Sequence, residues 1–107
     1  MISEQTIREA VERIVTAARP SRVILFGSHA RGDSDEGSDL DLLVIEPALV
    51  DRFQEMIRLR DAVGPIGRGV DVLVYSEEEA RRRGQVPGTV IYWALKEGRV
   101  VYDAASG

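Results

Sequence analysis

Residues 22–45 read RVILF-GSHARGDSDEGS-DLDLLVI, and this stretch decides the fold. Its first five residues form a compact apolar run, which is the pattern of a strand buried on both faces. Residues 27–38 are polar, include three glycines and have no apolar periodicity, as is typical of a turn region. Residues 39–45 are again mainly apolar, so the sequence predicts a second strand there.

Outside this stretch, helices and strands are expected to alternate. Residues 4–18 carry apolar side chains at helical spacing, with Ser3 as the expected N-cap and Pro20 marking the end. Residues 70–75 are a third apolar strand, and residues 99–102 are expected to form a short edge strand. The remaining helices are expected over residues 49–62, 77–83 and 88–97. In the first of these, the residues expected to face inward are Leu49, Phe53, Met56, Ile57 and Val63.

The order of these elements predicts an α/β fold in which helices flank a small mixed β-sheet. We expect a single domain over residues 1–107, because the sequence has no internal repeat, low-complexity tract or linker. A core of this size is adequate but not large. A partner protein or a homo-oligomer that covers more of the surface is therefore expected.

Composition excludes several classes of function. The chain has no cysteine, which excludes disulfides and thiolate metal sites. Its formal net charge of −4 argues against direct binding to a nucleic-acid duplex. No apolar run approaches the roughly 20 residues that cross a bilayer, and the polar N-terminus does not resemble a signal peptide. The expectation is a soluble cytoplasmic protein without a membrane partner.

Three aspartates are the candidate catalytic residues. Asp39 and Asp41 are two residues apart on an expected strand, so their side chains point to the same side. Two carboxylates about 4 Å apart repel by about 4 kcal/mol at an effective dielectric of about 20, unless a cation lies between them. Asp71 lies in another apolar run, where an acid is costly without a partner. If the two strands are neighbours, the three carboxylates converge and can bind two hard cations, Mg²⁺ or Mn²⁺.

The loop after the first strand is the candidate phosphate site. Gly27 allows a ligand close to the backbone, and Ser28 adds a hydroxyl and an amide near the expected start of a helical turn. Arg31 has the chemistry to bind a phosphate, although an ordinary surface arginine is an equal alternative. His29 is interpreted as a solvent-facing spacer, because a single histidine is not a metal site.

Each of these features also has a structural interpretation. Gly27 and Ser28 alone could be a strand-to-helix turn with an N-cap. Asp39 and Asp41 could line the solvated face of an edge strand, and Asp71 could cap a neighbouring turn. The combination of all of them in one order favours a catalytic site.

The combined motif resembles a known family. The segments are GSHARG at 27–32, SDLDLLV at 38–44, VDV at 70–72 and EGRVVY at 97–102. Together they resemble the DNA polymerase beta-like nucleotidyltransferases, and within them the minimal nucleotidyltransferase (MNT) domain. The resemblance covers most of the chain. It implies the polymerase-beta-like fold and a metal-dependent enzyme that uses ATP or another nucleoside triphosphate.

The resemblance also implies roles and a partner. Asp39 and Asp41 would bind both metal ions, Asp71 would be the third ligand and help to activate the attacking hydroxyl, and Gly27 and Ser28 would hold the triphosphate. MNT domains pair with small helical HEPN-type toxins, so the chain would be an antitoxin that transfers AMP to a tyrosine of such a partner. Two alternatives remain: an antitoxin that only binds and occludes its partner, and an enzyme that modifies a small molecule.

Overall fold

The computed structural model describes residues 3–32, 39–67 and 69–105. Helices and strands alternate along them, as the sequence predicts. The helices are α1 (Glu4–Ala18), α2 (Ser28–Arg31), α3 (Arg52–Val63), α4 (Glu77–Arg83) and α5 (Val90–Glu97). The strands are β1 (Arg22–Phe26), β2 (Leu40–Glu46), β3 (Val70–Ser76) and β4 (Arg99–Asp103). None of the helices in these residues is long and apolar enough to cross a membrane.

The four strands form one mixed sheet in the order β3-β2-β1-β4. β1 pairs antiparallel with β2 and with β4, and β2 pairs parallel with β3. The parallel pair needs a crossover connection, and α3 provides it. It carries the chain from the end of β2 back to the side of the sheet where β2 begins, so that β3 runs in the same direction. The expected mixed sheet and the expected edge strand near the C-terminus are both confirmed.

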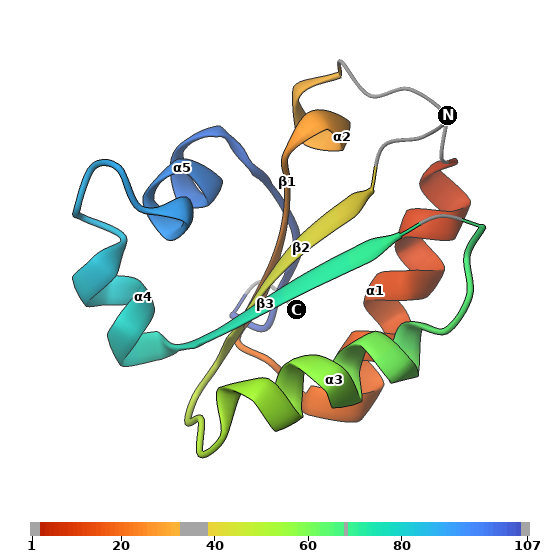
Figure 1. The fold of residues 1–107 in the computed structure, drawn as a ribbon, viewed down its shortest axis with the longest axis horizontal. Helices are drawn as coiled ribbons and strands as arrows, with labels where there is room; N and C mark the ends of the chain where they lie inside the picture. Colours follow the sequence, from red (N-terminus) through yellow and green to blue (C-terminus); the bar gives the residue numbers. More distant parts are fainter. Residues whose placement is uncertain (1–2, 33–38, 68, 106–107) are drawn as a thin grey trace.

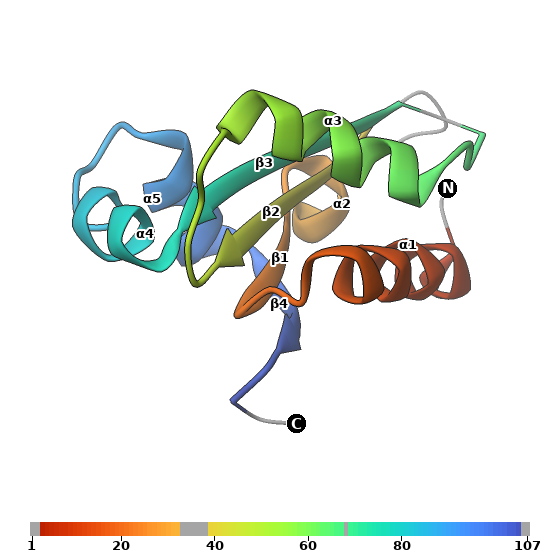
Figure 2. The same cartoon turned by 90° about the horizontal axis from the view of Figure 1, so that it is seen from below.

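Helices cover both faces of the sheet (Figures 1 and 2). α1 and α3 pack on one face, against a core that includes Leu40, Leu42 and Val44 of β2. α4 and α5 pack on the other face, against residues that include Leu43 and Ile45. Because both faces of β2 are covered, its apolar run is continuous, as expected of a buried strand.

Side chains at the helix N-termini act as the sequence suggests. The Ser3 hydroxyl accepts a hydrogen bond from the Thr6 amide, and Pro20 follows the last residues of α1. At α4, Ser76 and Glu79 form a reciprocal capping box. The acidic first turn and basic last turn of α4 suit the helix dipole, so its charges are explained by local structure.

The predicted inward face of the second long helix is wrong in part. Phe53 and Ile57 are exposed, with 76% and 50% of their surface accessible, whereas Leu59 is buried. The core-facing stripe of α3 consists of Met56, Leu59 and Val63, with successive spacings of three and four residues. Phe53 and Ile57 lie on a second apolar stripe that faces outward. The helix also begins later than expected, at Arg52 after its N-cap Asp51.

Candidate active site

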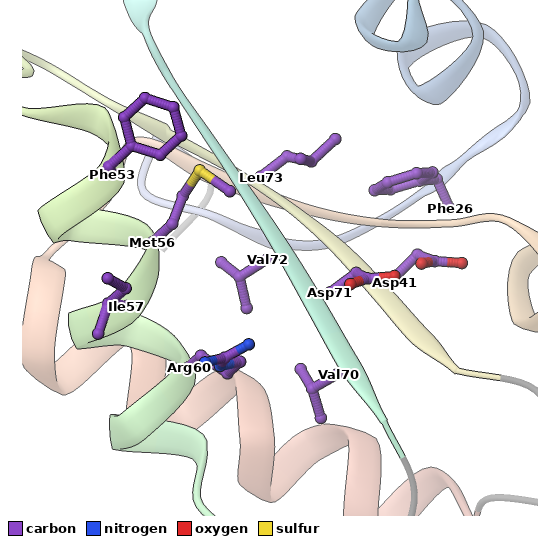
Figure 3. Close-up of a pocket in the computed structure, with 10 residues that line it drawn as sticks. All are labelled: Phe26, Asp41, Phe53, Met56, Ile57, Arg60, Val70, Asp71, Val72 and Leu73. Carbon is purple, nitrogen blue, oxygen red and sulfur yellow. The ribbon is translucent and has the colours of Figure 1, made fainter.

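A row of residues across the sheet brings two of the predicted carboxylates together. Asp41 on β2 is opposite Asp71 on β3, and Phe26 at the end of β1 is opposite Asp41. Side chains alternate along a strand, and Leu43 and Leu73 belong to the core on the α4–α5 side. Asp41 and Asp71 therefore point to that same face, where they lie side by side (Figure 3).

Asp39 lies one residue before β2 and is exposed. The Leu40 amide donates a hydrogen bond to the Gly69 carbonyl at 2.9 Å, which holds the start of β2 against the approach to β3. The Asp39 carboxylate lies directly against Gly69, so that a Cβ at residue 69 would overlap its Oδ1. The sequence does not predict this contact of Gly69 with Asp39. Its only signal was a glycine two residues before a candidate catalytic acid.

Gly27 has the same relationship to Asp41. Its φ is +75°, a left-handed conformation that favours glycine, and a Cβ there would overlap Oδ2 of Asp41. The Gly27 carbonyl accepts hydrogen bonds from the amides of Ala30 and Arg31, each at 3.1 Å, and these begin the short helix α2. The glycine turn and the Asp41 carboxylate are therefore in direct contact.

The electrostatics of the site are dominated by negative charge. Burial raises the pKa of Asp41 to about 6, and the charges of Asp71 and Asp39 and a side-chain hydrogen bond with Asp71 act in the same direction. The charge of His29 opposes them. These acids therefore interact electrostatically in the folded chain, and their mutual repulsion is only partly offset.

The residues fit a divalent cation. The candidate ligands Asp39, Asp41 and Asp71 offer only carboxylate oxygens, which hard ions such as Mg²⁺ and Mn²⁺ prefer. A cation among them would offset the repulsion that raises the pKa of Asp41. In the described parts of the chain, no three acidic or histidine side chains already surround one point as a metal centre.

The other predicted nucleotide-binding residues follow Gly27. Ser28 begins α2, and its side chain lies outside the described residues. His29 is half-buried, and Arg31 at the end of α2 is exposed. The part of the polar loop at residues 33–38 also lies outside the described residues. The roles of Ser28 and Arg31 toward a phosphate stay predictions.

A cleft of about 300 Å³ adjoins Asp41 and Asp71. It lies around β3 and is lined on its other side by α3, including Phe53, Ile57 and Arg60 (Figure 3). The exposed apolar stripe of α3 and the two carboxylates thus line the same cleft from opposite faces of β3. Apolar clefts with a few convergent polar groups are typical binding sites.

Comparisons with known proteins identify the family of the chain. Residues 4–101 match the family described as "Nucleotidyltransferase domain". A Methanocaldococcus jannaschii protein named "Putative protein adenylyltransferase MJ0604" is 32% identical over 110 residues, covering 95% of this chain and all of that protein. A second protein of that organism, "Putative protein adenylyltransferase MJ0141", is 71% identical over only 24 residues, which are 22% of this chain and 24% of that protein.

Two solved structures have a similar fold. One is described as "a putative nucleotidyltransferase from Sulfolobus solfataricus", with a TM-score of 0.67 and 24% identity over 96% of this chain and 82% of that one. The other is described as "the toxin-antitoxin with AMP-PNP", with a TM-score of 0.59 and 17% identity over 92% of this chain and 75% of that one. At these identities the similarity concerns the fold.

Proposed function

This chain belongs to the nucleotidyltransferase domain family, and we propose that it transfers AMP from ATP to a hydroxyl group of a protein. The observation that carries the proposal is the register of β2 and β3, which sets Asp41 beside Asp71 and against the Gly27 turn. A protein as the acceptor is supported by the relative named as a putative protein adenylyltransferase, which this chain covers over its whole length.

The proposed roles follow from position. The Gly27 turn and the amides at the start of α2 bind the triphosphate, with Ser28 and Arg31 as further contacts to its phosphates. Asp39, Asp41 and Asp71 hold two Mg²⁺ ions, or Mn²⁺ in their place. When bound, these ions supply Lewis-acid stabilisation of the charge on the attacking and leaving oxygens.

The proposed reaction is an in-line displacement. The acceptor hydroxyl oxygen forms a bond to the α-phosphorus, and the bond from that phosphorus to the oxygen bridging to the β-phosphorus breaks. Pyrophosphate leaves, and the acceptor keeps AMP in a phosphodiester linkage. Asp71 lies on the edge strand, and in the proposed reaction its carboxylate takes up the hydroxyl proton.

The proposed partner is a helical HEPN-type toxin whose tyrosine is the acceptor, with this chain as its antitoxin in the cytoplasm. The motif resemblance supports this assignment, and so does the fold shared with a structure described as a toxin-antitoxin. We propose that residues 1–107 form one domain and that the partner contributes to the acceptor site.

Labelling with α-³²P-ATP and Mg²⁺ tests the proposed function. The purified chain is incubated with a helical protein that co-purifies with it and, separately, with a lysate of the source cells. The expected result is label in a protein, resistant to denaturation and absent with the variant Asp39→Ala/Asp41→Ala. The matched control is Glu77→Ala/Glu78→Ala, which removes two acids from the first turn of α4 and should leave labelling unchanged.

Other outcomes would contradict the proposal. If no nucleotide labels any protein while the partner binds tightly, the chain is an antitoxin that acts by occlusion. Label that appears only on small hydroxylated compounds would identify a small-molecule enzyme. Labelling that survives in the Asp39→Ala/Asp41→Ala variant would remove these carboxylates from the mechanism.

A further inference from the structure

β3 is an edge strand, and the half of its outer edge next to the carboxylates has no hydrogen-bond partner among the described residues. Successive residues of a strand direct their main-chain groups to opposite edges. The Gly69 carbonyl accepts a hydrogen bond from Leu40, so Gly69 and, by alternation, Asp71 direct their main-chain groups toward β2. Val70 and Val72 therefore direct theirs outward.

Arg52 covers the other half of this edge. Its Nε donates to the Val74 carbonyl at 3.0 Å, which agrees with the outward direction of the even-numbered residues. The guanidinium also forms an ion pair with Glu79 and lies 5.1 Å from the centre of the Tyr75 ring. Val72 is only 4% exposed, but no hydrogen bond from a described residue reaches the outward main-chain groups of Val70 and Val72. An edge of this kind is a template for pairing with another chain.

Side chains beside the segment Val70–Val72 are suited to a protein ligand. Phe53 and Ile57 on α3 lie along this segment, and both side chains are exposed rather than packed into the core (Figure 3). Arg60 is one turn further along α3, next to Val70, and has no ion pair or hydrogen bond from its side chain to another described residue. An apolar strip that ends in a cation favours a partner segment that is apolar and then acidic.

We propose that a segment of the acceptor protein adds to the outer edge of β3 as an extended antiparallel strand, with its hydroxyl residue opposite Asp71. This inference rests on the proposed function and names how its protein substrate is held. In such a pair the main-chain groups of Asp71 face away from the added strand, which is the closer arrangement, with Cα atoms about 4.5 Å apart. The hydroxyl side chain then points to the face that carries Asp41 and Asp71.

The geometry also assigns a sequence pattern to the substrate. The neighbours of the hydroxyl residue point to the opposite face, toward α3. Because the added strand is antiparallel, the preceding residue is opposite Val72, beside Ile57, and should be apolar. The following residue is opposite Val70, beside Arg60, and should be acidic. The expected motif is therefore apolar, hydroxyl, acidic.

NMR with synthetic peptides tests this inference without nucleotide. The probe is Lys-Thr-Ile-Tyr-Asp-Thr-Lys, added to the ¹⁵N-labelled chain. We expect slower hydrogen exchange of the Val70 and Val72 amides, because both become hydrogen-bonded. N-methylation of the peptide's Ile and Asp amides should abolish binding, whereas N-methylation of its Tyr amide should not. The peptide with Ile and Asp exchanged is the matched control and should bind about tenfold more weakly.

Surface variants test the same contact in the labelling reaction. Phe53→Glu and Arg60→Glu change exposed side chains, so folding should be preserved, and each should reduce labelling of the acceptor by about tenfold. Val86→Glu changes a similarly exposed apolar residue outside α3 and should have no effect.

The outcomes separate this inference from the proposed function. If the peptide binds at Val70 and Val72 but no AMP is transferred, the proposed docking surface is supported and the proposed enzyme activity is overturned. Protein labelling with normal exchange at these amides, or with full activity in Phe53→Glu and Arg60→Glu, would overturn the docking surface alone. A stable dimer of this chain through β3 that the peptide does not dissociate would assign the edge to self-association instead.

Discussion

Two pairs of carboxyl groups lie at opposite ends of β2, and they differ in how their repulsion is relieved. Asp41 is near the start of the strand beside Asp71, on the α4–α5 side. Glu46 is at the end, on the α1–α3 side, where it meets Glu55. Five residues separate the two positions along the strand, a distance of roughly 17 Å. Both pairs combine burial with like charges, but their surroundings are opposite.

The Glu46 pair is closed and neutralised from within. Burial, then the hydrogen bond and charge of Glu55, raise the pKa of Glu46 to about 8, so that one proton serves the pair. Arg58 donates to both carboxylate oxygens of Glu55, at 2.7 and 2.8 Å, and to the Ala17 carbonyl at 2.9 Å. This pair joins β2 to α3 and, through Arg58, to α1.

The Asp41 pair is neutralised only in part by the described residues, among which the charge of His29 opposes the rise in the pKa of Asp41. Asp71 is exposed, and no arginine in the described parts of the chain forms an ion pair with Asp41 or Asp71. Asp41 lies against the Gly27 turn, and both acids line a cleft. The comparison indicates that clustered acids point to a binding site where the surrounding residues leave part of their charge for a ligand to neutralise.

The largest expected effect is on catalysis. Asp41→Asn should reduce AMP transfer by about 10²–10³-fold, the scale of losing one electrostatic group at a reacting centre. Glu46→Gln should leave transfer within about twofold, because the two sites are distant and share no contacts. Steady-state labelling rates measure both. Similar losses in the two variants would contradict the distinction between the pairs.

A smaller effect is expected from the glycine against Asp41. Gly27→Ala and Gly88→Ala both replace a glycine with positive φ, at +75° and +93°, but only the first adds an atom that overlaps a carboxylate. We expect Gly27→Ala to reduce transfer by up to about 10²-fold through displacement of Asp41. Gly88→Ala should cost only stability, by about 1–2 kcal/mol. Equal transfer rates, with melting temperatures as the check on folding, would contradict the contact.

The smallest effect is a pH dependence of stability at the closed pair. Glu46 keeps its proton in the folded chain up to about pH 8, whereas the unfolded chain loses it near pH 4.5. The unfolded state therefore binds fewer protons between these values, and the free energy of unfolding falls as pH rises. Urea denaturation should show a fall between pH 5 and 8 that is about 1–2 kcal/mol smaller in Glu46→Gln. The exposed Glu12→Gln should behave like the parent chain.

Much of the fold and of the candidate site could be predicted from the sequence, because local patterns determine them. The alternation at 39–45 indicates which side Asp41 faces, and the apolar runs indicate the mixed sheet. The outward stripe of α3 could not be predicted, because Phe53 and Met56 fit two overlapping helical faces and only packing selects one. Gly69 and Glu46 were missed for a related reason. Their contacts depend on the pairing of β2 with β3 and with α3, which no short pattern encodes.

Paramagnetic broadening by Mn²⁺ tests the central claim most directly, because one ¹⁵N-labelled sample contains both pairs. The account predicts that substoichiometric Mn²⁺ broadens the amide signals of Gly27, Asp41 and Asp71. The signals of Glu46 and Glu55 should stay sharp, and Asp41→Asn should lose the broadening. Broadening centred on Glu46 and Glu55, or unchanged broadening in Asp41→Asn, would contradict the claim that the open carboxylate pair is the metal site.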